Sequence, residues 1–378
     1  MTEFAELTGL TADTHPKRYL WTDAFAVCNF LELYRQSGNE EFRSLALSLV
    51  DQVHTILGHH RDDDSRTGWI SGLDEREGRE HPTLGGLRIG KDLNERQPND
   101  PFDEHWEWDR DGQYYHYLTK WLHALDCVSR VTVDSTYNLW AIELAKTAHA
   151  RFTYAPTFGG QKRMYWKMSI DLSRALVPSM GHHDPLDGYV TYHEIQATSA
   201  RNFANRERPN LEVEIADMAR LCRGKSWATD DPLGIGGLLF DLCRVGQLIV
   251  GNGLELTDLF QILQEASLQS LQVYSRNNSL GLPARYRLAF RELGLAIGLR
   301  GIKKLLALFE RESRHPEIKN NLGLETASVM RYVPLGEAIE TFWLAPGNRQ
   351  VDSWNAHRHI NMVMLATSLI PEGFLKVV

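Results

Sequence analysis

Apolar residues recur along most of the chain at the spacing of one face of an α-helix. The clearest stripe ends at Gly38, a residue type that commonly closes helices. It consists of Leu20, Ala24, Val27, Cys28, Leu31 and Tyr34. Similar stripes predict helices over residues 18–37, 39–57, 112–130, 135–153, 235–251, 256–275, 286–312 and 360–369. Alternating patterns are short and predict small strands within 161–170 and 187–193, so the chain is predicted to be all-α.

Neighbouring helices form pairs joined by short turns: 18–37 with 39–57, 112–130 with 135–153, and 235–251 with 256–275. Long loops rich in glycine and charge lie between the pairs, at 58–111, 154–186 and 313–334. A pair of helices of ~15–20 residues with a turn and a long loop takes roughly 50–70 residues. The 378 residues of the chain therefore accommodate about six helical hairpins. Because no Pro/Ser-rich linker divides the chain, we expect one domain over 1–378.

Composition excludes several classes of partner. A net charge of −8 without a basic stripe argues against a nucleic-acid partner. The most apolar window, 235–254, is interrupted by Asp241, Arg244 and Gln247, so no membrane partner is expected. The first residues, MTEFAELTGL, lack the basic and apolar regions of a signal peptide, and we expect a cytoplasmic protein.

The cysteines give no motif of their own. Cys28, Cys127, Cys222 and Cys243 lie far apart and include no CxxC pair. We interpret them as buried thiols that pack as small apolar side chains, and we expect neither a metal nor a cofactor.

One stretch, "DEHWEWDRDGQYYHYLTKW" from Asp103 to Trp121, places carboxylates among aromatic rings. Hydrolysis of a glycosidic bond requires two carboxyl groups, and Glu107, Asp109 and Asp111 are candidates for them. The rings of Trp106 and Trp108 would offer apolar faces to a sugar. The alternative for Asp111 is an ordinary role as cap of the helix that follows.

A second cluster, "GHHDPLDGYVTYHE" from Gly181 to Glu194, adds a fourth candidate carboxyl, Asp184. It also contains His183 and His193, but no HExxH spacing, so it does not predict a metal site. The alternative is a solvated turn around Pro185.

One acidic motif can be set aside. "RDDDSR" places Arg66 at the last position of a DDxxD motif, which argues against a terpene cyclase.

Further candidates lie where predicted helices begin. Each remaining candidate could equally be a surface or core residue. The residues predicted to bind a sugar are Trp21, Asp23, Arg88, Trp106, Trp108, Tyr115, His116, His183, His193, Trp354 and His357.

Two stretches, "RYLWTDAFAVCNFLELYRQSG" (18–38) and "SWNAHRHINMVMLATSLIP" (353–371), are similar to first and last hairpins of the six-hairpin glycosidase superfamily. The pattern of paired helices and long loops over nearly the whole chain also resembles that superfamily. The resemblance implies an all-α (α/α)6 toroid, with its site formed by the loops before residues 18, 112, 187, 235 and 357.

These observations favour a carbohydrate-active enzyme, and a glycoside hydrolase with paired carboxylates is the leading hypothesis. One alternative is a sugar epimerase or isomerase similar to N-acylglucosamine 2-epimerase, which uses histidines as acid and base. Another is a non-catalytic carbohydrate-binding or scaffold protein. The expected partner is a small carbohydrate, and the oligomeric state stays open.

Overall fold

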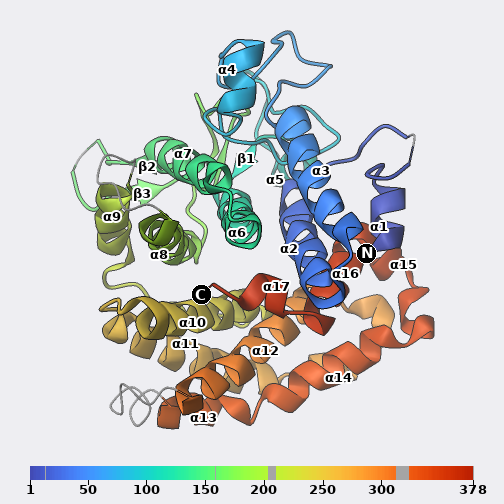
Figure 1. Ribbon diagram of the computed structural model, residues 1–378, viewed down its shortest axis with the longest axis vertical. Coiled ribbons are helices and arrows are strands. Elements are labelled where there is room, and N and C mark those ends of the chain that lie inside the picture. Colours follow the sequence, from blue (N-terminus) through green and yellow to red (C-terminus); the bar gives the residue numbers. More distant parts are fainter. Residues whose placement is uncertain (13, 158, 203–209, 312–322, 378) are drawn as a thin grey trace. The chain divides into compact units, whose positions relative to one another are not determined.

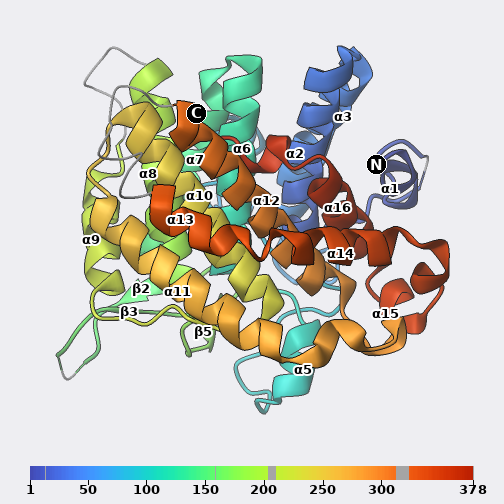
Figure 2. The same ribbon diagram turned by 90° about the horizontal axis from the view of Figure 1, so that it is seen from below.

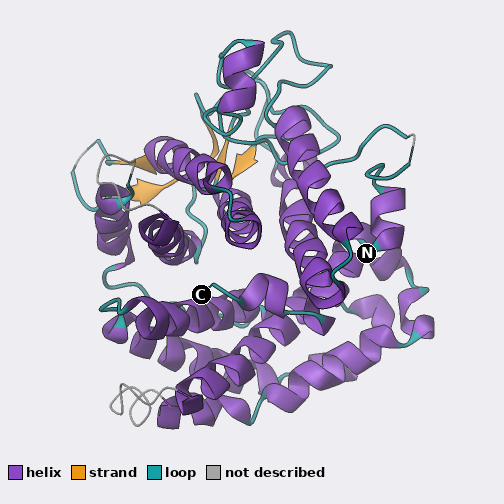
Figure 3. Cartoon of the chain, in the orientation of Figure 1, coloured by secondary structure: helices purple, strands orange, loops and turns teal. Residues whose placement is uncertain are grey.

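The computed structural model describes residues 1–378 except 13, 158, 203–209, 312–322 and 378. Contacts within the chain define two compact units, an N-terminal unit, Thr2–Arg223, and a C-terminal unit, Gly224–Val378. Helices make up most of both units, and the short strands of the described residues lie in the N-terminal unit (Figure 3). The prediction of an all-α protein is confirmed.

The N-terminal unit is built from helical hairpins around a buried helix, α6. Its helices are α1 (Thr2–Leu7), α2 (Leu20–Ser37), α3 (Glu40–Leu57), α4 (Glu75–Glu80), α5 (Glu104–Asp109), α6 (Tyr115–Thr132), α7 (Ser135–Phe152), α8 (Asp184–Asn202) and α9 (Glu212–Cys222). The pairs α2–α3 and α6–α7 are the predicted hairpins, and α6 also packs against α2 and α8 (Figure 1). Gly38 ends α2 with φ of 68°, and the side chain of Asn39 caps α3.

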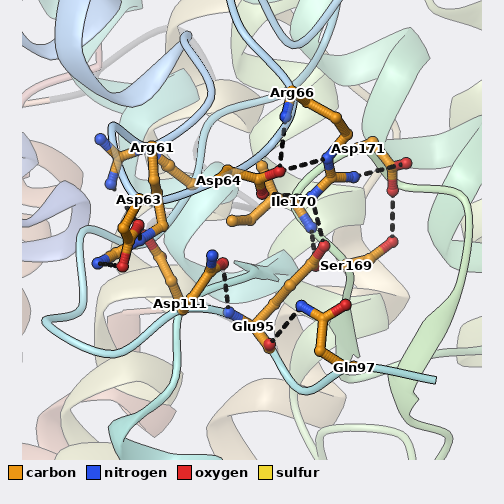
Figure 4. A network of polar contacts seen from close by, with 12 residues as sticks. Arg61, Asp63, Asp64, Arg66, Glu95, Gln97, Asp111, Ser169, Ile170 and Asp171 are labelled. Atoms are coloured by element: carbon orange, nitrogen blue, oxygen red, sulfur yellow. Dashed lines mark hydrogen bonds and ion pairs between the residues drawn. The ribbon is translucent and has the colours of Figure 1, made fainter. Parts of the chain in front are cut away.

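Two long loops of this unit are fastened to each other by ion pairs. Arg66 bonds to the carboxylates of Asp64 and Glu95 and lies 2.9 Å from Asp171 (Figure 4). The Glu95 carboxylate also accepts from the backbone N–H of Ile170. The strands of these loops are β1 (Gln113–Tyr114), β2 (Thr153–Tyr154), β3 (Arg163–Met164), β4 (Lys167–Met168) and β5 (Ala175–Val177). They form one sheet in the order β1-β4-β5 and a second of β2 and β3, so the strand prediction for 161–170 is confirmed.

The strand prediction for 187–193 is wrong, because these residues lie inside α8. The helix packs against α6, α7 and α9. Its apolar residues therefore occur on more than one face, which obscures the helical period. Gly188 permits one of these approaches, since a Cβ there would lie 2.1 Å from the hydroxyl of Tyr115.

The C-terminal unit is centred on the packing of α10 (Pro232–Asn252) against α12 (Ala289–Arg311) (Figure 2). Glycines allow the two backbones to approach, because a Cβ on Gly236 would lie 2.2 Å from the carbonyl oxygen of Gly294. The other elements are α11 (Thr257–Arg276), η1 (Asn278–Gly281), η2 (Ala284–Tyr286), α13 (Gly323–Met330), α14 (Val333–Leu344), η4 (Pro346–Arg349), α15 (Asp352–Asn355), α16 (Arg358–Leu369) and α17 (Glu372–Leu375). Of the predicted loop 313–334, residues 313–322 lie outside the described residues.

Helix α10 has the length and composition of a membrane span, the one such helix among the described residues. Of its most apolar window, 78% is buried inside the protein. Arg244 in this helix donates a hydrogen bond of 2.5 Å to Asp241, and both side chains are buried. A core helix of the unit accounts for these features.

Candidate active site

His116 and Asp184 are brought together by the packing of α6 against α8. His116 lies in the first turn of α6, Asp184 is the first residue of α8, and the His116 Nδ1 to Asp184 Oδ1 distance is 3.8 Å. Pro185 follows in the first turn of α8, where a missing N–H does not break the helix. The start of α6 is held by buried Gln113, whose side-chain amide donates to the carbonyl oxygens of Gly85 and Ile170 in the two long loops.

The carboxyl of Asp184 is in an environment that favours its protonated form. Burial, and then the nearby carboxylate of Asp187, raise its pKa to about 7, although Lys120 acts in the opposite direction. Asp187 accepts hydrogen bonds from Lys120 Nζ at 2.7 Å and from the hydroxyl of Thr119. Near neutral pH Asp184 can therefore act as a proton donor.

The imidazole of His116 is in an environment that favours its neutral form. Burial and the positive charge of Lys120 lower its pKa to about 4. The side chain still keeps 31% of its exposure, so solvent reaches part of the ring. A neutral imidazole beside a protonated carboxyl is a base next to an acid.

Both groups have unmet hydrogen-bonding capacity. Among the described residues, His116 Nδ1 and Asp184 Oδ2 are buried atoms without a hydrogen-bond partner. Buried polar atoms are nearly always paired, so unpaired atoms on two adjacent titratable groups mark a site where a ligand can bind.

Aromatic rings from three helices, a strand and two loops lie near this pair. His116 is stacked on Trp166 with ring centroids 6.2 Å apart, and Trp166 meets Trp108 edge to face at 4.9 Å. The hydroxyls of Tyr117 and Tyr19 are hydrogen-bonded at 2.6 Å. We call this group the aromatic wall, and its members are Tyr19, Trp21, Trp108, Tyr114, Tyr117 and Trp166. Tyr19, Trp108, Tyr117 and Trp166 are partly exposed, and such faces suit the apolar C–H side of a sugar ring.

Asp111 is held by two guanidinium groups and two backbone N–H groups. Its carboxylate, fully buried, accepts from the guanidinium groups of Arg88 at 2.9 Å and Arg61 at 3.4 Å. It also accepts from the backbone N–H groups of Gly90 and Gly112. The capping alternative is also wrong, because α6 begins after Tyr114 without a side-chain cap. Arg88, predicted to bind sugar, is engaged here and with the carbonyl oxygens of His59 and Ile56.

The other two candidate carboxyls of residues 103–121, Glu107 and Asp109, differ in burial. Glu107 is buried and forms ion pairs with Arg96 at 2.8 Å and Lys167 at 3.0 Å. Asp109 is exposed at the end of α5. Trp106 and Trp108 are 56% and 46% exposed, and Trp108 alone of the two belongs to the aromatic wall. The structure thus does not present these carboxyls as a catalytic pair.

Three sugar-binding candidates are core residues instead. Tyr115 is fully buried and donates a hydrogen bond to the hydroxyl of Tyr192. Asp23 is buried and accepts from the backbone N–H of Tyr19, and burial raises its pKa to about 6. Trp21 is 7% exposed and contacts the ring of Tyr117, so it supports the aromatic wall from behind.

The histidine candidates separate by position. His183 directly precedes Asp184, and its ring contacts that of His182 at 4.5 Å. His193 is nine residues after Asp184 on α8, which places it on the opposite helix face, beside Tyr189. Trp354 and His357 belong to the C-terminal unit, where they contact the rings of Trp343 and Phe290.

Sequence reasoning missed the groups that set the protonation of the pair. Lys120 is four residues after His116, and Asp187 is three residues after Asp184, so each shares a helix face with its neighbour. That spacing would have predicted these neighbours if both segments had been taken as helices. Trp166 carried no signal, because its position depends on the loop that joins β3 and β4.

No family model matches the chain, and no curated protein matches it. Solved structures do. The cellobiose 2-epimerase of Spirochaeta thermophila DSM 6192 is similar over 99% of this chain and 97% of its own, with a TM-score of 0.50 and 12% identity. The chain has the (α/α)6 fold. A sugar epimerase from a ruminal bacterium matches with a TM-score of 0.46 and 10% identity, over 93% of this chain and 87% of its own. The similarity to the cellobiose 2-epimerase confirms the fold that was predicted from the resemblance to the six-hairpin glycosidase-like superfamily.

Proposed function

We propose that the chain is a sugar epimerase or isomerase in which His116 and Asp184 transfer protons. The observation that carries this proposal is the pairing, at 3.8 Å, of an imidazole with a pKa of about 4 and a carboxyl with a pKa of about 7. Two adjacent groups whose pKa values are pushed apart are typical of an acid and a base in one site. The aromatic wall beside them suits a sugar, and the fold is that of a cellobiose 2-epimerase.

The chemistry follows from the protonation states. Neutral His116 takes the proton from the carbon next to the carbonyl of an open-chain sugar. Protonated Asp184 donates its proton to the carbonyl oxygen, so the product of this step is a neutral enediol. Exact reversal of the two transfers regenerates the substrate. Return of the proton to the opposite face of the same carbon gives an epimer, whereas its delivery to the other carbon of the enediol, with loss of the proton from the other hydroxyl, gives an isomer. The reaction needs no second carboxylate and no cofactor.

A glycoside hydrolase is less well supported, because the carboxyls first proposed for it are engaged elsewhere or exposed. Asp111 and Glu107 are bound by two cations each, and Asp109 is exposed. A purely binding role is also less well supported, since binding a neutral sugar does not require a carboxyl with a pKa of about 7.

The products distinguish these functions. We expect the purified chain, incubated with reducing monosaccharides and disaccharides that include cellobiose, to convert at least one of them into a sugar of unchanged mass. The measurement is chromatography combined with NMR of the products. Release of two smaller sugars from a disaccharide would replace this proposal with the hydrolase.

A further inference from the structure

Cys28, His123 and Cys127 form a compact group in the core of the N-terminal unit. Cys28 lies on α2, and His123 and Cys127 lie one turn apart on α6, the helix that packs against α2. One potential ligand atom from each residue lies within 4.8 Å of the others, and all three residues are buried. Tetrahedral Zn²⁺ with Zn–S bonds of about 2.3 Å sets its sulfur ligands roughly 3.8 Å apart. The group is therefore close to the size of a metal site.

The imidazole of His123 is oriented as a metal-binding histidine is. Its Nδ1 is hydrogen-bonded to the carboxylate of Glu194 at 2.8 Å, and its Nε2 lies 3.6 Å from the Sγ of Cys127. Metal-binding histidines almost always donate their second ring N–H to a carboxylate or carbonyl, which fixes the tautomer and the ring plane. Glu194, fully buried on α8, supplies that partner and directs Nε2 toward the two sulfur atoms.

The charges around the group accommodate a divalent cation. Arg130 donates to the Sγ of Cys127 at 3.1 Å, and its own charge is matched by Asp126 at 2.9 Å and Glu194 at 3.5 Å. Two thiolates balance the charge of one divalent metal. Burying a charge is costly unless it is paired, and here each charged group has a partner of opposite sign.

We propose that Cys28, His123 and Cys127 bind a thiophilic metal ion such as Zn²⁺, in a site separate from the His116–Asp184 pair. Thiolate and imidazole ligands select soft or borderline metals over Mg²⁺ and Ca²⁺. Both sulfur atoms bind a metal as thiolates, so metal binding is accompanied by the release of protons from the ligands. Three ligands come from the protein, one fewer than the usual structural set.

The role of such a site is structural, because its ligands are buried and connect α2 to α6. Glu194 links the same group to α8, so a metal there connects the helix that carries Asp184 to α6 and, through α6, to α2. A metal that binds only the folded state stabilises a protein by mass action. Loss of the metal should therefore lower stability before it alters the chemistry of a sugar site.

The test uses the untagged full chain, reduced and stripped with a chelator that is then removed. We expect it to take up one equivalent of Co²⁺ with a sulfur-to-cobalt charge-transfer absorption, and Zn²⁺ to displace the cobalt and raise Tm by several degrees. Cys28→Ser should lose the absorption. Cys243→Ser, which changes another buried cysteine in the C-terminal unit, should keep it.

The wild-type chain alone can overturn the proposal, even if Cys28→Ser fails to fold. Cobalt binding without the sulfur band would place the metal on surface histidines. An unchanged Tm with Zn²⁺ would show that the folded state has no site for it. An absorption that survives in Cys28→Ser, or is lost in Cys243→Ser, would contradict the assignment of ligands.

Discussion

Replacing Asp184 with Asn is expected to lower turnover of the sugar substrate by about 10²–10⁴-fold, the usual cost of losing an acid or base catalyst. The same change should not destabilise the protein at pH 8. Burial and the neighbouring Asp187 disfavour the charged form of Asp184, and an amide removes that charge while keeping the shape. A catalytic group held at a cost to stability is a common feature of active sites.

The effect of the Asp184 carboxyl on stability depends on pH. The pKa of Asp184 is about 7 in the folded protein, against 3.8 for an unperturbed aspartate, so the folded state binds more protons between these values. The carboxyl therefore lowers stability progressively as pH rises from about 4 to about 7, by up to about 4 kcal/mol at 1.36 kcal/mol per pKa unit. Asp184→Asn should raise Tm at pH 8 and change it little at pH 4.

Asp217 provides the matched control, as another buried carboxylate beside a histidine in the same unit. It lies 3.0 Å from His149. Burial raises its pKa, but hydrogen bonds from Lys162 and Arg220 outweigh burial and the net shift is downward. Asp217→Asn should therefore lower Tm at pH 8 and leave turnover of the folded protein near normal. Equal activity loss in both variants, or a collapsed Tm for Asp184→Asn, would make Asp184 a structural residue.

Asp111→Asn should destabilise the protein by about 3–5 kcal/mol, the cost of removing one partner from a buried ion pair. The change leaves Arg61 and Arg88 without the carboxylate that both contact, and the side chain of Asp111 is fully buried. The midpoint of denaturant unfolding, followed by circular dichroism, measures this loss.

Asp109→Asn changes a neighbouring candidate carboxyl that, unlike Asp111, is exposed. Asp109 is exposed, so its substitution should change stability by no more than about 0.5 kcal/mol. It should also leave turnover unchanged, whereas the carboxylate-pair hypothesis expected Asp109 to be essential. A stable Asp111→Asn protein with abolished turnover would restore that hypothesis.

The helices could be predicted because their periods are local. The stripe of 18–37 became α2, Leu20–Ser37, and that of 135–153 became α7, Ser135–Phe152. Residues 187–193 could not be recognised as part of a helix, because α8 is covered by neighbours on several sides and lacks a single apolar face.

The candidate site was only partly predictable, because it depends on which helices are neighbours. His116 and Asp184 were both named from the sequence, yet nothing in it indicates that α6 and α8 pack together, since 67 residues lie between His116 and Asp184. The ion pairs of Asp111 were not predictable for the related reason that Arg61 and Arg88 reach it from a distant part of a loop. Cys28 meets Cys127 only once α2 packs on α6.

Exchange of carbon-bound hydrogen with solvent tests the central claim most directly. In D₂O the wild-type chain should introduce deuterium at the carbon next to the carbonyl of its sugar substrate, as followed by NMR. Folded His116→Asn should not, whereas His149→Gln, which changes another histidine of the same unit, should exchange normally. Exchange that persists at the wild-type rate in His116→Asn would contradict the proton-transfer role of the His116–Asp184 pair.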